Sequence, residues 1–274
     1  VENITIKSGY RVNLNFSGKD SIVYNKDLIF PPQIYDNIKL LTSDRPPSSQ
    51  VFSDVSSSDI NAYLKQFDKG FSAKVFRTRL ASEVMYNALT DLNFKKGENL
   101  TKTRVKALFG KANAAVANIL NHSRTVPPKA KENVDKDKKK LVEKRKELRE
   151  KKKEGKSTKQ LEKSIKTLMD RIENKTDTMA VAVGTSLQNY IDPRLVYSWV
   201  KTQADIVSEG EEEENIEANT ATIASAVYTT DLRKTFSWAE NLTEPGWSWM
   251  SSPLIGDPAL EPAVDAPQPK PVKQ

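Results

Sequence analysis

Hydrophobic and polar residues alternate along much of the first thirty positions. In "YRVNLNF" the side chains of Val12, Leu14 and Phe16 fall on one face, and "SIVY" resumes after the turn "SGKD". Alternation with a period of two is typical of a β-strand with one buried face. The pattern predicts a β-hairpin with Lys19 at its tip. Between 30 and 58, "FPPQ", "DRPPSSQ" and "DVSSSD" favour loops around the short apolar run "IYDNIKLL".

The spacing of apolar residues then becomes helical and predicts helices over 58–65, 79–92 and 102–120. The last of them carries small residues in "GKANAAVANIL", which suit close helix packing. After "RTVPPKAKE", leucine and valine recur every seven residues, and after "KEGKS" apolar residues recur at spacings of four, three and four. Two helices with narrow apolar seams, joined by a turn at Gly155, predict an antiparallel coiled-coil hairpin. Each arm would project about 30 Å. The seam residues are Val134, Leu141, Leu148, Leu161, Ile165, Leu168 and Ile172.

A further helix is predicted to begin at Pro193, because Asp192 can cap it and proline fits the first helical position. Tyr190 then lies on or beside a turn. The acidic stretch "SEGEEEENIE" reads as a loop, and helices are expected near 218–228 and around Phe236 and Trp238. Proline-rich sequence from 245 predicts an extended or disordered tail. The fold class is mainly α with a small N-terminal β-hairpin or sheet.

Charge and composition narrow the choice of function. The net charge is +7, and residues 129–175 hold 19 Lys and Arg against 10 Asp and Glu, a net of +9 for that segment. A long basic element fits a nucleic-acid partner, although Lys/Glu-rich helices are as often merely solvated. Cysteine is absent and His122 is the one histidine, which excludes disulfides, thiolate sites and imidazole-rich metal clusters. No apolar run approaches the about 18 to 20 residues that cross a bilayer, so no membrane partner is expected.

Four residues could carry chemistry, and each has an ordinary interpretation. Lys19 on a hairpin tip is by default a solvated lysine. Arg77, with Arg79, opens a predicted helix, where the helix dipole disfavours a cation and so hints weakly at a bound anion. His122 follows a long apolar helix, where a capping histidine is the commoner case. Tyr190 alone reads as a packed aromatic.

Together the segments around these residues resemble a known family. "FSGKDSI", "AKVFRTRLAS", "ILNHSRTVPPK" and "GTSLQNYIDPR" resemble the signature segments of eukaryotic-type DNA topoisomerase IB, in the same order and at compatible separations. The basic hairpin stands where that family has its linker, and "RKTFSWAEN" resembles the last helix of its C-terminal domain. The resemblance covers about residues 1–242. Tyrosine recombinases share the mechanism and part of the fold, but the "YIDPR" ending and a long coiled linker are not recognised as theirs.

The resemblance implies the tyrosine-recombinase/topoisomerase IB catalytic fold with a protruding linker. It divides the chain into the C-terminal part of a catalytic core at 1–128, a linker at 129–176, a C-terminal domain at 177–244 and a tail at 245–274. It also implies that the chain relaxes supercoiled double-stranded DNA by single-strand cleavage, strand rotation and religation. No ATP, metal or other cofactor is needed, and the implied location is the nucleus.

The resemblance also assigns roles to residues. Tyr190 would be the nucleophile that forms a 3′-phosphotyrosyl intermediate, Arg77 and His122 would bind the non-bridging phosphate oxygens, and Lys19 would protonate the departing 5′ oxygen. A second set of residues would contact DNA, namely Asn189, Lys74, Arg79 and Arg124.

Two parts of the family pattern have no match here: a first catalytic arginine upstream of the lysine hairpin, and the cap domain that closes over DNA. The chain therefore resembles the C-terminal part of an enzyme, inactive or slow until an N-terminal region or subunit supplies them. It could be a fragment of a longer chain, a natural subunit, or a non-enzymatic DNA-binding component that retains the fold. A more distant alternative is an assembly protein built on the coiled hairpin and the acidic segment.

Overall fold

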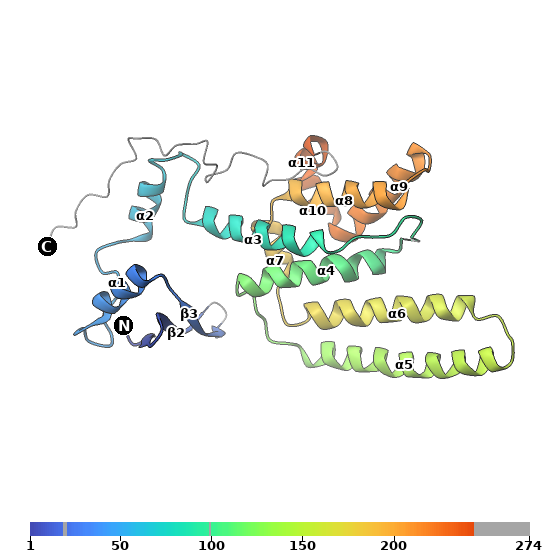
Figure 1. Ribbon diagram of the computed structural model, residues 1–274, viewed down its shortest axis with the longest axis horizontal. Coiled ribbons are helices and arrows are strands. Elements are labelled where there is room, and N and C mark those ends of the chain that lie inside the picture. The colour runs from blue at the N-terminus through green and yellow to red at the C-terminus, as the bar shows by residue number, and fades with distance from the viewer. Residues whose placement is uncertain (19–20, 99, 244–274) are drawn as a thin grey trace. The chain divides into compact units, whose positions relative to one another are not determined.

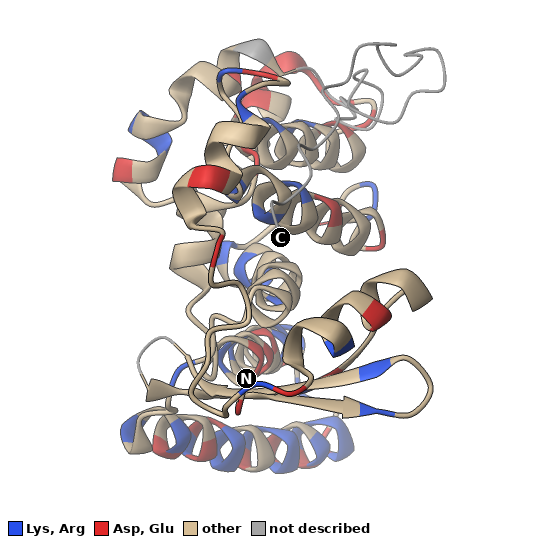
Figure 2. Cartoon of the chain, turned by 90° about the vertical axis from the view of Figure 1, so that its left-hand side faces the viewer, with Lys and Arg blue, Asp and Glu red and all other residues tan. Residues whose placement is uncertain are grey.

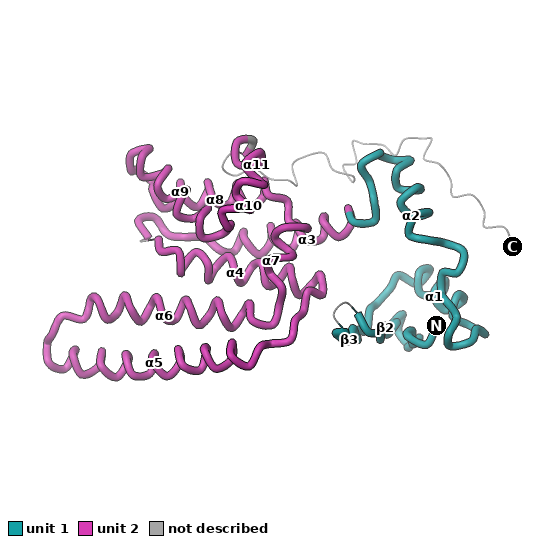
Figure 3. The backbone as a smooth tube through the Cα atoms, turned by 180° about the vertical axis from the view of Figure 1, so that it is seen from behind, with its two compact units in different colours: residues 1–74, 266–274 teal, residues 75–265 magenta. Residues whose placement is uncertain are grey.

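A computed structural model describes residues 1–18, 21–98 and 100–243 (Figure 1). The chain divides into two compact units, of which the first covers residues 1–74 and the second begins at Val75 (Figure 3). Within the described ranges the structure is mainly helical, with one small antiparallel sheet. No helix in this part of the chain is both long enough and apolar enough to cross a membrane.

The first unit is built on a three-stranded sheet of β1 (Ile4–Lys7), β2 (Arg11–Ser17) and β3 (Val23–Ile29), in that order. The predicted hairpin is β2 and β3, which pair with Phe16 opposite Tyr24. Two helices follow the sheet: α1 (Pro32–Thr42) and α2 (Ser57–Leu64), the latter closed by a capping box between Ser56 and Asp59.

Helix α1 was not predicted, because the flanking prolines and serines favoured loops. Tyr35, Ile38 and Leu41 recur every third residue and form its half-buried face, and Pro32 suits a helix start. The Tyr35 hydroxyl donates to the Lys7 carbonyl at 3.0 Å, and its ring meets the edge of the Tyr10 ring. Tertiary contacts with the sheet therefore stabilise a helix that the local sequence signals weakly.

In the described part of the second unit the regular elements are helices (Figure 1), and one isolated antiparallel bridge joins Ser123 to Val181. Most of the helices begin near a predicted start, but α7 was not predicted as a helix, and the single helix predicted around Phe236 and Trp238 is divided into two. Helix α9 begins in the predicted acidic loop. Glutamates in a first helical turn interact favourably with the helix dipole, which explains that start. In chain order the helices are α3 (Lys74–Thr90), α4 (Lys102–Ile119), α5 (Pro128–Lys153), α6 (Lys159–Thr178), α7 (Val183–Asn189), α8 (Pro193–Val207), α9 (Glu213–Val227), α10 (Thr230–Thr235) and α11 (Ser237–Leu242).

The core of this unit lies where α3, α4, α8 and α9 meet. Trp199 of α8 packs between Phe94 and Phe109, with ring centroids 6.0 and 5.9 Å away. Beside it the buried Gln203 side chain accepts a hydrogen bond from the Phe94 amide at 2.8 Å. These contacts join the beginning of the helical unit to a segment about a hundred residues later in the chain, and they fix the frame on which the candidate site stands.

The long helices α5 and α6 pair antiparallel, as the apolar seam predicted (Figure 1). Val134, Leu161, Ile165 and Leu168 are buried. Helix α6 also lies along α4, where Gly110 lets it come close: a Cβ at Gly110 would collide with the side-chain amide of Asn174. The hairpin is thus attached to the helical body along α6, and the prediction that both arms project from it is not confirmed.

Ion pairs join α5 to α6 and α6 to α4. The Asp137 carboxylate of α5 accepts two hydrogen bonds from Arg171 and one from Lys175 of α6, at 2.7 to 3.0 Å. Asp170 of α6 accepts one from Arg104 of α4 at 3.3 Å. On α5, the lowest helix in Figure 2, Lys and Arg outnumber Asp and Glu by 13 to 6, and the acidic residues are interspersed among short runs of basic ones.

Candidate functional site

The site begins where α4 ends and the chain leaves for the α5–α6 hairpin. After the cap at Leu120, Asn121 takes a left-handed conformation with φ of 56°, and the His122 amide donates to the Ala117 carbonyl at 2.8 Å. This turn points the chain away from the helix axis and leaves the His122 side chain half-buried at the edge of the core.

The hairpin returns the chain to the same place. The Ala182 amide donates to the His122 carbonyl at 2.8 Å, and the Arg124 amide donates to the Ala180 carbonyl at 2.9 Å. Residues 122–124 and 180–182 therefore run side by side. Because α7 follows directly, the segment that carries Tyr190 starts next to His122.

Tyr190 lies between the C-terminal end of α7 and the start of α8, beside a turn as predicted. Its amide donates to the Ser186 carbonyl at 3.0 Å, and its neighbours Leu187 and Ile191 are buried. Asp192 caps α8 as predicted, since its side chain accepts from the Arg194 amide at 2.9 Å. The carboxylate also pairs with the Arg194 guanidinium, and this hydrogen bond raises the pKa of Arg194. The tyrosine is therefore held from both sides of the turn.

Arg77 joins these two segments from α3. The helix begins at Lys74, so Arg77 lies one turn inside it rather than at its first residue. The Nη2 atom donates to the Leu120 carbonyl and lies 3.3 Å from His122 Nε2. The guanidinium carbon is 5.1 Å from the centroid of the Tyr190 ring, a cation–π arrangement.

Arg77, His122 and Tyr190, which are distant in the sequence, thus form one cluster. The His122 and Tyr190 ring centroids are 5.3 Å apart. Two cationic or hydrogen-bonding groups beside a phenol could bind an anion next to a nucleophile.

One member of the cluster was missed by the sequence analysis. Ser186 is fully buried, and its Oγ atom lies 2.9 Å from His122 Nδ1. It stands inside the quoted segment "GTSLQNY", but serine is common in turns and caps, and no periodicity or charge singles it out. The contact depends on the meeting of two segments 64 residues apart.

The other predicted contacts are placed less closely. Arg124 donates to the Met179 and Thr178 carbonyls at 3.0 and 3.3 Å, which caps the end of α6. Asn189 is exposed and donates to the Thr185 carbonyl at 3.1 Å. Arg79 follows Arg77 by two residues on α3 and so faces another direction. Lys74 is the last residue of the first unit, and Lys19 lies outside the described residues, as does the tail from 245.

Comparisons with known proteins define the class as a DNA topoisomerase. The profile described as "Eukaryotic DNA topoisomerase I, catalytic core" matches residues 1–156, and that of the "C-terminal topoisomerase domain" matches residues 162–207. The chain belongs to the eukaryotic DNA topoisomerase I family, which confirms the resemblance drawn from the sequence.

Several relatives are named as DNA topoisomerases. DNA topoisomerase 1 of Drosophila melanogaster is 31% identical over 202 residues, 69% of this chain and 20% of that protein. DNA topoisomerase 1 of Mus musculus is 26% identical over 264 residues, 88% of this chain and 32% of that protein. For the mitochondrial DNA topoisomerase I of Rattus norvegicus the figures are 28% over 212 residues, 69% of this chain and 35% of that protein. The chain thus spans about a fifth to a third of these relatives.

Proposed function

We propose that this chain carries the nucleophile and part of the phosphate-binding machinery of a type IB DNA topoisomerase. The observation that supports it is the cluster of Arg77, His122 and Tyr190, which unites three of the segments that resemble the family. The proposed activity is transient cleavage of one strand of duplex DNA, rotation of the free end, and religation.

The chemistry suits these residue types. The Tyr190 oxygen attacks the phosphorus while the phenol proton passes to water, a bond from tyrosine to the 3′ phosphate forms, and the bond to the 5′ oxygen breaks. The phosphate ester of tyrosine conserves the energy of the broken bond, so the 5′ hydroxyl can attack it and reseal the strand without ATP. Arg77 and His122 would donate to the non-bridging oxygens as negative charge gathers on them. Lys19 as the donor of a proton to the 5′ oxygen stays a prediction from the resemblance.

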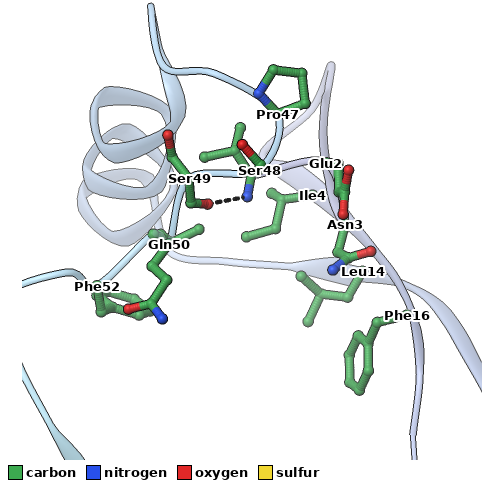
Figure 4. A pocket seen from close by; sticks show the side chains of 12 residues that line it. Glu2, Asn3, Ile4, Leu14, Phe16, Pro47, Ser48, Ser49, Gln50 and Phe52 are labelled. Carbon is green, nitrogen blue, oxygen red and sulfur yellow. Dashed lines mark hydrogen bonds between the residues drawn. The ribbon is translucent and has the colours of Figure 1, made fainter.

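A partner region that completes the site is also proposed. By resemblance, the family has a further arginine and a cap domain that have no match here. The first unit supports such a partner through its exposed apolar surface. Among its described residues Val12 is the one buried hydrophobic side chain, while Ile29, Leu40 and Phe52 are 74%, 76% and 62% exposed. An apolar groove of about 490 Å³ runs past Ile4, Leu14 and Phe16 (Figure 4). Surface of this kind is typical of an interface.

The basic hairpin would lie near the rotating DNA and retard it through sequence-independent attraction to phosphates. The acidic residues interspersed among the lysines and arginines of α5 equally suit a helix that faces water. Nuclear location stays a prediction, and one relative carries the word mitochondrial in its name.

The decisive test is a suicide-cleavage assay. The chain is mixed with a nicked duplex, with and without a separately supplied N-terminal topoisomerase region, and covalent DNA adducts are located by peptide mapping. We expect an adduct at Tyr190 when the N-terminal region is present. Tyr190→Phe should abolish the adduct and leave duplex binding nearly unchanged, and Tyr86→Phe on α3 serves as the matched control.

The other outcomes separate the alternatives. An adduct at a different residue, or equal loss of adduct and binding in Tyr190→Phe, would contradict the nucleophile assignment. If the wild-type chain forms no adduct in either mixture yet still binds duplex DNA, the structural DNA-binding component becomes the better interpretation.

A further inference from the structure

Ser186 contacts two members of the cluster, Tyr190 and His122. Its carbonyl accepts the Tyr190 amide at 3.0 Å, and its hydroxyl lies 2.9 Å from His122 Nδ1. The serine is fully buried, so water does not compete for the hydroxyl. A buried hydrogen bond of this kind restricts the rotation of the imidazole ring.

The partners of His122 determine which ring nitrogen carries the proton. A guanidinium group only donates hydrogen bonds and remains protonated in proteins. At 3.3 Å from the Arg77 Nη2 atom, His122 Nε2 must therefore accept, which requires Nε2 to be without a proton. A neutral imidazole then carries its proton on Nδ1, and that proton points to the Ser186 oxygen.

We infer that Ser186 is a positioning residue that holds His122 in the Nδ1–H tautomer when no DNA is bound. Its oxygen accepts from Nδ1–H, and this leaves Nε2 as the acceptor that faces Arg77. In this state Arg77 and His122 are paired with each other.

The inference rests on the proposed function for its consequence in catalysis. A phosphate oxygen is an acceptor, so His122 can bind it only through a protonated Nε2. A serine hydroxyl both donates and accepts. When the proton leaves Nδ1 for water and another joins Nε2, the hydroxyl can turn and donate to Nδ1, so the buried contact is kept in both states. Alanine at this position offers neither partner.

The test needs no catalytic activity, because His122 is the one histidine of the chain. Long-range ¹H–¹⁵N correlation spectra of the DNA-free chain with ¹⁵N-histidine report the protonation of each ring nitrogen. We expect Nδ1 with a pyrrole-type shift and Nε2 with a pyridine-type shift in the neutral ring. In Ser186→Ala the two shifts should move toward each other as the Nε2–H tautomer becomes populated.

Ser82→Ala is the matched control. Ser82 is also a buried serine of this core, and its hydroxyl accepts the Asp192 amide at 3.1 Å, but that hydrogen bond does not involve His122. It should leave the imidazole shifts unchanged.

A wild-type chain with Nε2–H as its main tautomer would overturn the inference, even if the variants do not fold. Unchanged shifts in a folded Ser186→Ala chain would overturn it as well. Neither result depends on whether Tyr190 cleaves DNA, so a failure here is distinguishable from a failure of the proposed function.

Discussion

The ion-pair cluster at Asp137 provides a quantitative test of how the α5–α6 hairpin is held together. The Asp137 side chain is 9% exposed, whereas its partners Arg171 and Lys175 are 46% and 40% exposed. Asp137→Asn keeps the shape of the side chain and removes its charge. The neutral side-chain amide of the asparagine then faces the two cations Arg171 and Lys175, which can only donate hydrogen bonds.

The expected loss follows from this geometry. Removing one partner of a buried ion pair costs about 3–5 kcal/mol, while a hydrogen bond to a charged group contributes about 1.5–3 kcal/mol. Both cations are partly exposed and can be hydrated in the variant, so the loss of free energy should lie near the lower end of these ranges. We expect the free energy of unfolding of the hairpin to fall by about 2 kcal/mol.

The measurement is hydrogen exchange of the α5 and α6 amides together with urea unfolding at pH 7. Glu147→Gln is the matched control on the same helix, because Glu147 pairs with Lys151 at an exposed position. Exposed pairs of this kind contribute little. If Asp137→Asn destabilises the hairpin no more than Glu147→Gln does, the reasoning is refuted.

The pH dependence gives an independent check. Burial alone would raise the pKa of Asp137, but the hydrogen bonds from Lys175 and Arg171 outweigh it, and the pKa lies below its ordinary 3.8. A carboxylate with a lowered pKa contributes stability above its ordinary pKa and loses it as the pH falls through the folded value. The difference between wild type and Asp137→Asn should therefore be full at pH 7 and shrink below about pH 4. A constant difference down to pH 2 would contradict the ionic origin of the effect.

Three further predictions concern the tyrosine turn, the core and the hairpin. Asp192→Ala should lower the free energy of unfolding by about 1 kcal/mol in a urea titration, and Asp192→Asn, which can still cap α8, by much less; equal losses would contradict the capping role. Burial, helped by the charge of Glu240, raises the pKa of Tyr197 to about 12, so the folded state resists its ionisation and stability should fall as the pH rises from 10 toward 12, less steeply in Tyr197→Phe. In an assembly completed by the N-terminal region, removing whole turns from both arms near Gly155 should change the rate of supercoil relaxation more than the yield of adduct, and an equal effect on both would contradict the proposed role of the hairpin.

Local features of the sequence predicted most of the secondary structure, and the reason is chemical. Asp192 and Pro193 specify a helix start by themselves, and the recurring leucines of the hairpin specify two helices that must bury one seam. The turn at Gly155 adopts a φ of 65°, which glycine reaches without strain. Such signals depend on a few neighbouring residues, so they can be recognised in the sequence without knowledge of the rest of the fold.

The candidate site was predicted only as a set of residues. Resemblance to a family identified Arg77, His122 and Tyr190, but no local signal says that they meet. The three residues come together because residues 122–124 pair with residues 180–182 at the two ends of the α5–α6 hairpin, and because α3 packs beside these paired segments.

The sequence alone thus determined most of the helices and strands, the basic hairpin and the family, and it predicted which side chains react, because short local patterns and the order of motifs carry this information. Only the tertiary structure decided that α1 is a helix, that α6 lies along α4, and that Ser186 and Arg77 flank His122. These outcomes are sums of many weak contacts between distant segments. A side chain such as the buried hydroxyl of Ser186 acquires its role from the neighbour that folding brings to it.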